Sequence, residues 1–508
     1  MYLGLNCAQR QFKALIIDST SGKTIFSGAV DYDQDLPHRD TRDGITFDRN
    51  TAYSYTDPQL WIEALDLILE RIVDEGIDVS KIKVISGCAR PSVLFFNDQL
   101  PDAISHLNPN LTLIDQLRPC YTSRKACISL DSTASSYKKE IEAQFGTPET
   151  IQLITGTRHH TNTGCVQIKK FADLQPQSWD ETNFIHTAGT YLSSVLTGKQ
   201  APLDHSDSAQ LGLVDLKKRA WDSKLIAATS SQLEEKLPQL REGLTEIGCI
   251  SDYFVHKYGF SPETRCTIWH SKTACDLVGI GMNREGITSI KLSDTYTCST
   301  ALKAFKIDPI GAASISIHPL GGYIGRVSLE NGYRTFATVR RALGVAEDAQ
   351  VEELLDIIPT TKNEPVLPFL FEEKSLAIPA SDIIDTTLLS LANGQFLHLK
   401  LYSQWHGSPT SMLIISGKGM YIEGLRNVAA NVFQSNAVCM DNKNTAATGA
   451  CILAANMDGQ PLLALRKTYC RPYFKTSYAP EPYMANIYNA HLLTYHKKLQ
   501  AHLHEQTL

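Results

Sequence analysis

Hydrophobic and polar positions alternate over residues 2–30 in the pattern of three short strands joined by two turns. Apolar side chains occupy every second position in Leu3–Leu5 and again in Phe12–Ile16, which is the period of a β-strand. One turn falls between these stretches, and the polar run Asp18–Lys23 supplies the other. The chain is therefore predicted to open with an antiparallel strand–turn–strand unit.

A helix is predicted over Pro58–Val73, because its apolar residues recur on one face at a spacing of three to four. Asp57 is a suitable N-cap, and Pro58 suits the first helical turn. The apolar face is formed by Trp61, Leu65, Ile68, Leu69 and Ile72. Lys83–Gly87 follows as a short apolar strand, and this alternation of strands and helices predicts an α/β protein.

The second half of the chain repeats the opening pattern. Gly286–Leu302 reads as strand, polar turn and strand, and it follows a helical stretch near Cys275–Met282. A chain of 508 residues is too long for one hydrophobic core. We therefore expect two domains, residues 1–250 and 251–508, in a duplicated architecture with a cleft between the halves.

Composition and charge argue against several classes of function. The net charge of −6 and the lack of a Lys/Arg cluster speak against nucleic-acid binding. No apolar run approaches the roughly 20 residues that cross a bilayer, and the N-terminus lacks the layout of a signal peptide. The twelve cysteines are scattered without a CxxC pair, which argues against a zinc site and for a reducing cytosol. We expect a cytoplasmic protein.

Five segments resemble stretches of one protein family. They are Leu36–His38 followed by Gly44, Trp61–Leu67, Leu153–Arg158, Ser206–Ala209 and Asp252–Phe260. The chain resembles the FGGY family of carbohydrate kinases, and within it the eukaryotic-type xylulokinases, over nearly its whole length. The resemblance implies a duplicated actin-like, ribonuclease-H-like α/β fold, with sugar and nucleotide bound in an interdomain cleft.

The resemblance places the general base in a stretch that lacks the expected carboxylate. Family members carry this aspartate in a Gly-Asp-Asn run that opens a helix, and the matching stretch here is Trp269–Asp276. The position of the base is Lys272 or Thr273, and a protonated lysine cannot accept a proton. Asp276 lies about one turn further on and is a conceivable substitute. A displacement of about 5 Å would ruin the attack geometry, which favours Asp276 as a surface or helix-interior carboxylate.

Both phosphate hairpins depart from the family pattern. In the first, Asn6 stands where the family has the aspartate that holds the magnesium of ATP. Arg10, in the turn, would either meet a phosphate or be an exposed turn residue. In the second, the expected Gly-Thr-Ser appears as Ser293, Asp294 and Thr295. An acidic side chain there repels polyphosphate unless magnesium bridges the two.

The nucleotide-base side is closer to the family. Leu413–Gly419, with Gly417 and Lys418, resembles the strand and glycine loop before the adenine-contacting helix. Asn444–Ala450 resembles the small-residue helix start that closes the adenine pocket. Close helix packing explains the same small residues equally well.

The sugar side is mixed. The family's sugar-contacting Gln-Gln-His-Gly loop appears as Cys88–Ser92, so its contacts are lost and Arg90 takes part of its place. Asp131 matches the family aspartate that binds sugar hydroxyls, and Arg158 matches as well. A pocket holding Arg90, Asp131 and Arg158 would suit a polar or anionic ligand such as a sugar phosphate. The alternative is an internal ion pair in an empty cleft.

The joint loss of these parts predicts a pseudoenzyme, a xylulokinase-like scaffold kept for binding or regulation. No catalytic or metal-binding residue is assigned, and no cofactor is expected unless the chain is active, when it would need ATP and magnesium. A sugar or sugar phosphate and an unidentified protein partner are the expected ligands, and a homodimer is compatible with the family.

Two alternatives stay open. The first is a divergent kinase that phosphorylates D-xylulose or a related sugar or polyol, with Asp276 as base and Asp294 as metal ligand. The second is a regulator whose cleft closes on a sugar and alters a protein interface.

Overall fold

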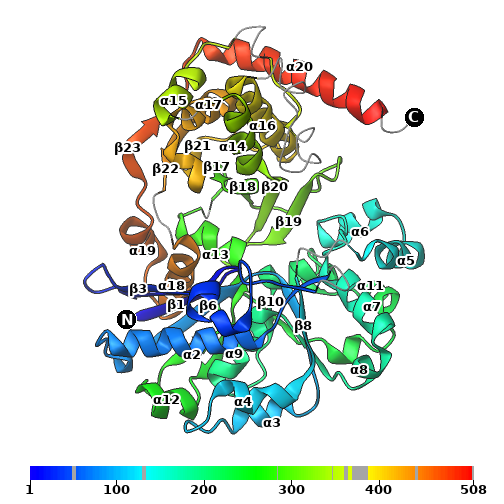
Figure 1. Ribbon diagram of the computed structural model, residues 1–508, viewed down its shortest axis with the longest axis vertical. Coiled ribbons are helices and arrows are strands. Elements are labelled where there is room, and N and C mark those ends of the chain that lie inside the picture. Colours follow the sequence, from blue (N-terminus) through cyan, green and yellow to red (C-terminus); the bar gives the residue numbers. More distant parts are fainter. Residues whose placement is uncertain are drawn as a thin grey trace. The chain divides into compact units, whose positions relative to one another are not determined.

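The chain forms two compact units, each with its own sheet and core (Figure 1). The computed structural model describes residues 1–48, 53–128, 133–282, 284–345, 347–359, 364–368, 387–440 and 444–505. Unit 1 comprises Met1–Gly281, Ser316–Gly322 and Asn444–Cys470, and unit 2 comprises Met282–Ile315, Tyr323–Lys443 and Arg471–Leu508. Residues 251–281 and 444–470, assigned from the sequence to the second domain, thus pack with unit 1.

The main sheet of unit 1 has the strand order β14-β15-β6-β1-β2-β3, with β16 also pairing β6. Its first three strands form the predicted antiparallel unit, and β6 runs parallel to β1. The strands are β1 (Tyr2–Cys7), β2 (Gln11–Asp18), β3 (Lys23–Asp31), β6 (Val84–Ala89), β14 (Glu246–Cys249), β15 (Arg265–Thr267) and β16 (His270–Ser271). The carboxyl ends of β1, β6 and β16 therefore lie at one edge of the sheet.

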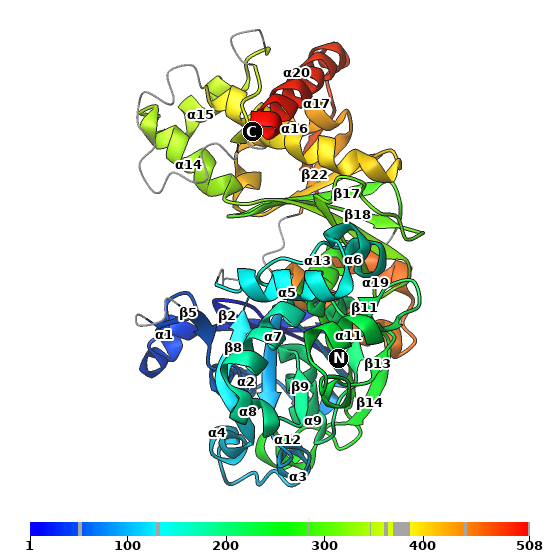
Figure 2. The same cartoon turned by 90° about the vertical axis from the view of Figure 1, so that its right-hand side faces the viewer.

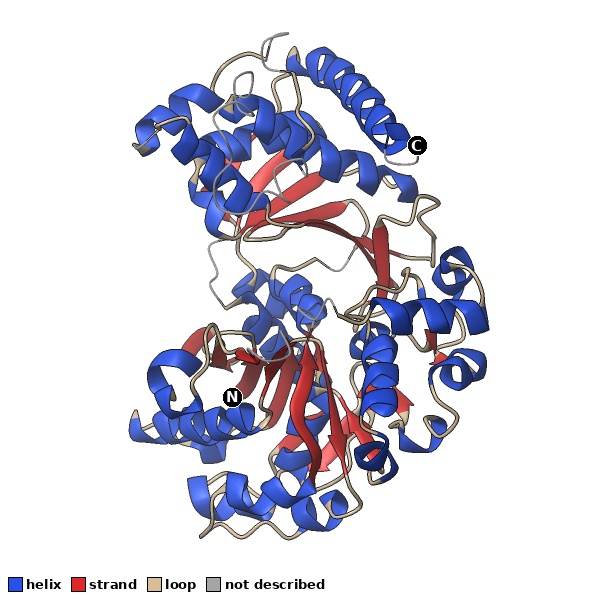
Figure 3. Ribbon diagram, turned by 45° about the vertical axis from the view of Figure 1, so that its right-hand side comes forward, coloured by secondary structure: helices blue, strands red, loops and turns tan. Residues whose placement is uncertain are grey.

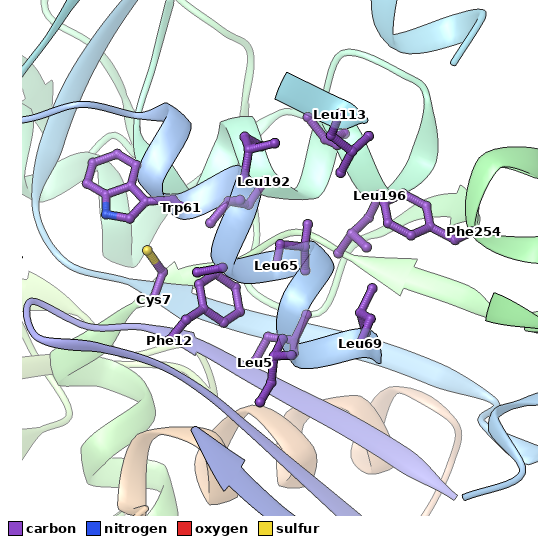
Figure 4. Packing of buried hydrophobic residues seen from close by; sticks show 14 of the residues in the cluster. Leu5, Cys7, Phe12, Trp61, Leu65, Leu69, Leu113, Leu192, Leu196 and Phe254 are labelled. Atoms are coloured by element: carbon purple, nitrogen blue, oxygen red, sulfur yellow. The ribbon is translucent and has the colours of Figure 1, made fainter. Parts of the chain in front are cut away.

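Helices cover both faces of this sheet. On one face α2 (Gln59–Asp74) buries its apolar stripe against side chains of β1 and β2, and Figure 4 shows Leu5 and Phe12 packed beside Trp61 and Leu65. The helix starts one residue later than predicted, with Pro58 rather than Asp57 at the N-cap position, and the carboxylate of Asp57 accepts a hydrogen bond from the backbone N–H of Gln59 at 3.0 Å.

The opposite face carries α18 (Thr445–Met457), which packs on β1, β2 and β6. The approach is close enough to require glycine in the strand. A Cβ on Gly4 would lie 2.8 Å from the backbone nitrogen of Cys451. Strand β1 and helix α18 are more than 400 residues apart in the chain and pack against each other in unit 1.

The rest of unit 1 holds a second sheet, two short ladders and further helices. The second sheet has the order β4-β5-β8-β7-β9, and the ladders are β10-β13 and β11-β12. The strands are β4 (Thr46–Asp48), β5 (Tyr53–Thr56), β7 (Ser92–Phe96), β8 (Tyr121–Ile128), β9 (Phe184–His186), β10 (Leu203–Asp204), β11 (Val214–Asp215), β12 (Ala220–Trp221) and β13 (Leu240–Arg241). The helices are α1 (Tyr32–Asp35), α3 (Leu100–Ser105), α4 (Leu113–Leu117), α5 (Ser135–Phe145), α6 (Pro148–Thr155), α7 (Gly164–Leu174), α8 (Pro176–Asp180), α9 (Ala188–Thr197), α10 (His205–Ser208), α11 (Ser223–Thr229), α12 (Asp252–Tyr258), α13 (Lys272–Gly279) and α19 (Leu462–Tyr469).

Unit 2 is built on a seven-stranded mixed sheet of order β19-β20-β18-β17-β21-β22-β23. The predicted hairpin over 286–302 is confirmed, because β17 and β18 pair antiparallel around the turn at 293–295. The strands are β17 (Ile287–Leu292), β18 (Tyr296–Leu302), β19 (Ala313–Ile317), β20 (Tyr323–Leu329), β21 (Met412–Ser416), β22 (Asn436–Cys439) and β23 (Tyr473–Tyr478). The helices are α14 (Gly332–Ala342), α15 (Asp348–Leu355), α16 (Leu388–Ser403), α17 (Glu423–Phe433) and α20 (Met484–Glu505).

Helices and sheets alternate in both units, which confirms the α/β class. In unit 2 α16, α17 and α20 lie together on one side of the strands β17 and β18 (Figure 2), and Figure 3 shows helices layered against each main sheet. Within the described part of the chain no helix has the length and apolar character needed to span a bilayer.

Candidate functional site

The position of the family's general base lies at the start of α13. Strand β16 ends at Ser271, whose hydroxyl caps the helix by accepting from the backbone N–H of Ala274 at 3.2 Å. Lys272 is therefore the first residue of the helix, and Thr273 the second. Lys272 Nζ lies 2.7 Å from one carboxylate oxygen of Asp276, and the Thr445 hydroxyl donates to the other at 2.6 Å. Each oxygen of Asp276 thus already accepts a hydrogen bond.

Asn6 occupies the carboxyl end of β1 and is 4% exposed. Its amide oxygen accepts from the Cys88 thiol at 3.5 Å, across the parallel pair β1–β6. On its other side it pairs in register with Lys13 of β2. Burial, and then the charge of Lys272, lower the pKa of Lys13, while Asp276 acts in the opposite sense. Two ammonium groups and one carboxylate therefore lie at this edge.

Lys13 was not singled out from the sequence, although a signal was present. In an antiparallel hairpin, residues that pair across the ladder point to the same face. The turn after Cys7 places residue 13 opposite residue 6. Hairpin register therefore identifies Lys13 as a neighbour of the position that lost its aspartate.

Arg10 lies in the exposed turn and forms an ion pair with Asp43. Its Nε lies 2.9 Å from a carboxylate oxygen of Asp43, and its Nη2 donates to the other at 3.1 Å. This is the arrangement of the exposed turn residue that the sequence analysis gave as an alternative to a phosphate contact.

Arg90 is the first residue after β6 and is 5% exposed. Its Nη1 is buried without a hydrogen-bond partner. Burial lowers the pKa of Arg90, and the ionisable neighbours that act on it are Cys7 and Tyr32. Burial also raises the pKa of Cys7 to about 12 and that of Tyr32 well above its usual value. Both neighbours are therefore uncharged at neutral pH and supply no counter-charge.

The other two residues of the predicted sugar pocket are not brought to Arg90 by the described structure. Arg158 Nη2 pairs with Glu149 at 3.1 Å, and its Nε donates to Gln152 at 3.4 Å. Asp131 lies outside the described residues. A three-residue pocket stays a prediction.

A buried acidic cluster beside the start of α13 escaped the sequence analysis, which noted Ser206–Ala209 only as a resemblance. Asp207 accepts from the hydroxyl of Thr187 and the amide of Gln210, each at 2.6 Å. Burial, and then the charge of Asp204, raise the pKa of Asp207 to about 7. Its two carboxylates lie three residues apart in the sequence, but their burial depends on Thr187 and His270 from other elements.

Asp204 shows the opposite behaviour. His270 Nδ1 lies 3.3 Å from a carboxylate oxygen of Asp204, and the Ser206 hydroxyl donates to the same oxygen. Burial acts to raise the pKa of Asp204, but His270 and Ser206 outweigh it and the pKa falls. The Ser206 hydroxyl oxygen also accepts from the backbone N–H of Ser271 at 3.1 Å, so the cluster holds the residue that caps α13.

In unit 2 the second hairpin turn meets the glycine loop after β21. Asp294 lies 3.5 Å from Lys418 Nζ, and the Thr295 hydroxyl donates to Glu330 at 2.7 Å. Gly417 has φ of +91°, and a Cβ there would lie 2.6 Å from the carbonyl oxygen of Leu292 and 2.8 Å from the Ser293 hydroxyl. Only glycine fits this position.

Lys418 also lines a cavity of about 230 Å³ that the sequence did not predict. The other lining residues are Tyr333, Arg340, Asp348, Val351, Glu352, Tyr421 and Ile422. Two tyrosine rings suit a flat group, while the charges of the lining are balanced, because Arg340 pairs with Asp348 at 2.9 Å, Lys418 with Asp294, and Glu352 adds another carboxylate. A nucleotide at this place, with Gly417 and Lys418 as contacts, stays a prediction.

Asn444, predicted on the nucleotide side, lies in unit 1 and donates to the Ser27 hydroxyl at 2.7 Å. The small residues that follow it form a close helix crossing. A Cβ on Gly449 would lie 2.7 Å from the carbonyl carbon of Cys275 in α13. The close packing that the sequence analysis offered as an alternative is therefore present.

Comparison with known proteins identifies the scaffold. A model of the FGGY family of carbohydrate kinases, N-terminal domain, matches residues 1–279. Xylulose kinase 2 of Arabidopsis thaliana is 24% identical over 487 residues, covering 90% of this chain and 87% of that protein. Xylulose kinase of Rattus norvegicus is 22% identical over 518 residues, covering 97% and 95%.

Solved structures show the same fold. A ligand-bound xylulose kinase from Lactobacillus acidophilus matches with a TM-score of 0.81 at 17% identity, covering 98% of each chain. A glycerol kinase from Plasmodium falciparum with ADP matches with a TM-score of 0.79 at 13% identity, also over 98% of each chain. The predicted two-domain sugar-kinase fold is confirmed.

Proposed function

This chain belongs to the FGGY family of carbohydrate kinases, and from that premise we propose that it is a xylulokinase-like pseudoenzyme. It has lost ATP-dependent phosphorylation and keeps the scaffold to bind a sugar-like ligand or to regulate a partner. One observation carries the proposal: α13 opens on Lys272, ion-paired to Asp276, at the place of the general base.

The described contacts at the start of α13 support the loss of the general base. A lysine side chain carries its proton at neutral pH. Asp276 accepts from Lys272 with one oxygen and from Thr445 with the other, and both hydrogen bonds stabilise its charged form and make it a weaker base. Losing a general base alone slows such reactions by roughly 10²–10⁴.

Magnesium does not fit the described edge of unit 1. The hard oxygen ligands that it prefers are carboxylates and water, whereas Asn6 is neutral and accepts from Cys88. Lys13 and Lys272 add positive charge close by. No group of three or more His, Cys, Asp or Glu side chains in the described ranges is arranged to hold a metal ion. We therefore derive no catalytic step through a metal here.

A divergent kinase is the second candidate, favoured by the cavity beside Lys418, whose two tyrosine rings suit the flat base of a nucleotide. In that case Asp276 would be the base and Asp294 the metal ligand. Both carboxylates would first have to leave a lysine, since Asp276 pairs with Lys272 and Asp294 with Lys418.

The deciding experiment is ADP release by the purified protein with excess ATP, magnesium and D-xylulose. We expect no more ADP than in a control with ATP alone, while an active xylulokinase run in parallel produces ADP. Sugar-dependent turnover above about 1 per second, the low end of kinase rates, would contradict the proposal. The Asp276→Asn variant then separates the alternatives, because a divergent kinase that uses Asp276 loses its activity.

A further inference from the structure

Arg90 is a buried cation to which the described part of the chain supplies no counter-charge. It leaves β6 at the edge where the strands end, and its backbone N–H donates to the carbonyl of Cys7 at 3.0 Å. Its guanidinium Nη1 has no hydrogen-bond partner, and no described carboxylate lies within ion-pair distance of it. Its ionisable neighbours, the Cys7 thiol and the Tyr32 phenol, are both neutral.

The neighbours of Arg90 are engaged with each other and carry no negative charge. The Tyr32 hydroxyl donates to the carbonyl of Ala8 at 3.2 Å and lies 3.8 Å from the Cys7 sulfur. Figure 4 shows the Cys7 sulfur near Trp61, in the apolar core. An uncompensated buried charge is strongly unfavourable, and proteins keep such groups paired. Since the described residues supply no anion to Arg90, an anionic ligand would provide the missing counter-charge.

The surroundings at this edge also favour negative charge in the ligand. Strands β16 and β6 pair Ser271 with Ala89, so Lys272 and Arg90 are the residues that follow two paired strand ends. Lys13 lies within electrostatic reach of Lys272, and the two share the carboxylate of Asp276. In open α/β sheets ligands bind beyond the carboxyl ends of the strands.

We infer that Arg90 binds the phosphate or carboxylate of an anionic sugar, without a metal ion. The planar guanidinium presents paired N–H donors that match either group in bidentate geometry. A neutral ketose would leave the charge of Arg90 uncompensated. This inference rests on the proposed function, since it names the ligand class of the same sugar-side site.

The test measures binding by isothermal titration calorimetry in EDTA with four probes. They are D-xylulose, D-xylulose 5-phosphate, D-gluconate and inorganic phosphate. We expect the sugar phosphate or gluconate to bind at least tenfold more tightly than D-xylulose, because hydrogen bonds to charged groups contribute about 1.5–3 kcal/mol. The tighter of the two tells whether the group is a phosphate or a carboxylate.

Two variants assign the effect to Arg90. Arg90→Met should abolish the preference for the anionic sugar, and it should raise the melting temperature without ligand because it removes an uncompensated buried charge. Arg90→Lys should keep part of the preference. Arg124→Met is the matched control, since Arg124 already pairs with Asp57, and it should leave the preference unchanged.

Several results would overturn the inference. Equal affinity for D-xylulose and both anionic sugars would do so, as would an Arg90→Met variant that melts lower and keeps the preference. If inorganic phosphate binds as tightly as the sugar phosphate, the site recognises the anion alone and the sugar is not part of its ligand. Sugar-dependent ADP release would instead refute the proposed function, so the two failures can be told apart.

Discussion

The variant Gly449→Ala is expected to destabilise unit 1 by about 3 kcal/mol, although alanine normally stabilises a helix. In an exposed helix the same change gains roughly 0.5–1 kcal/mol. Here the new Cβ would lie 2.7 Å from the carbonyl carbon and 3.0 Å from the Cα of Cys275. These are backbone atoms of α13 that no rotamer change can move.

The crossing of α13 and α18 is tight from both sides. A Cβ on Gly279 would lie 2.8 Å from the carbonyl carbon of Thr445 and 3.0 Å from the backbone nitrogen of Gly449. Added methyl groups therefore force the helices apart, and overpacking of this kind costs about 1–3 kcal/mol or more. Separation of the helices would also pull Thr445 away from Asp276, which fixes Lys272.

Thermal unfolding followed by circular dichroism measures the effect. Gly449→Ala and Gly279→Ala should each lower the melting temperature by several degrees. Met457→Ala, on the half-buried end of the same helix, should change stability by less than about 1 kcal/mol. A melting temperature that rises in Gly449→Ala, as for an ordinary helix glycine, would show that the crossing is looser than described.

Local patterns predicted the elements of this fold well. Alternation over 2–30 located β1, β2 and β3, and the period of apolar residues over 58–73 located α2 within one residue at each end. Each of these two patterns depends only on residues that are close together in the sequence, so it can be recognised without knowledge of the tertiary contacts. The resemblance also placed residue 272 at a helix start, where the structure has it.

Long-range packing could not be predicted in the same way. Asn444–Ala450 was assigned from the sequence to the second domain, yet it packs in unit 1, because the contact depends on glycines in two helices far apart in the chain. The approach of Asp204 to His270 likewise joins β10 to β16. The residues next to Asp204 and next to His270 in the sequence do not indicate that these two side chains will be buried against each other.

Burial of Asp207 is expected to contribute a progressive loss of stability as pH rises from about 4 to 7, and Asp207→Asn should remove this contribution. The pKa of Asp207 is about 7 in the folded state against an ordinary 3.8. Between these values the folded protein binds a proton that the unfolded chain releases, so higher pH favours unfolding. One pKa unit corresponds to about 1.4 kcal/mol, which sets the full effect at roughly 4 kcal/mol.

An asparagine at residue 207 can keep both contacts without carrying a charge. Its amide oxygen can accept from Gln210, and its amide nitrogen can donate to the Thr187 hydroxyl, which accepts as readily as it donates. At pH 8 the variant should therefore melt several degrees higher than the natural protein. At pH 4, where Asp207 is protonated in the folded state, the two should differ little.

Asp204→Asn is the matched control, with the opposite sign. The pKa of Asp204 is lowered in the folded state because His270 and Ser206 outweigh burial, so its carboxylate stabilises the fold above pH 4 and this contribution is lost as pH falls. Removing it should lower the melting temperature at pH 8, where Asp207→Asn raises it. Melting curves of the three proteins from pH 4 to 8.5 give the comparison. Parallel curves for Asp207→Asn and the natural protein would show that Asp207 does not titrate there, and that the cluster holding the cap of α13 keeps both charges.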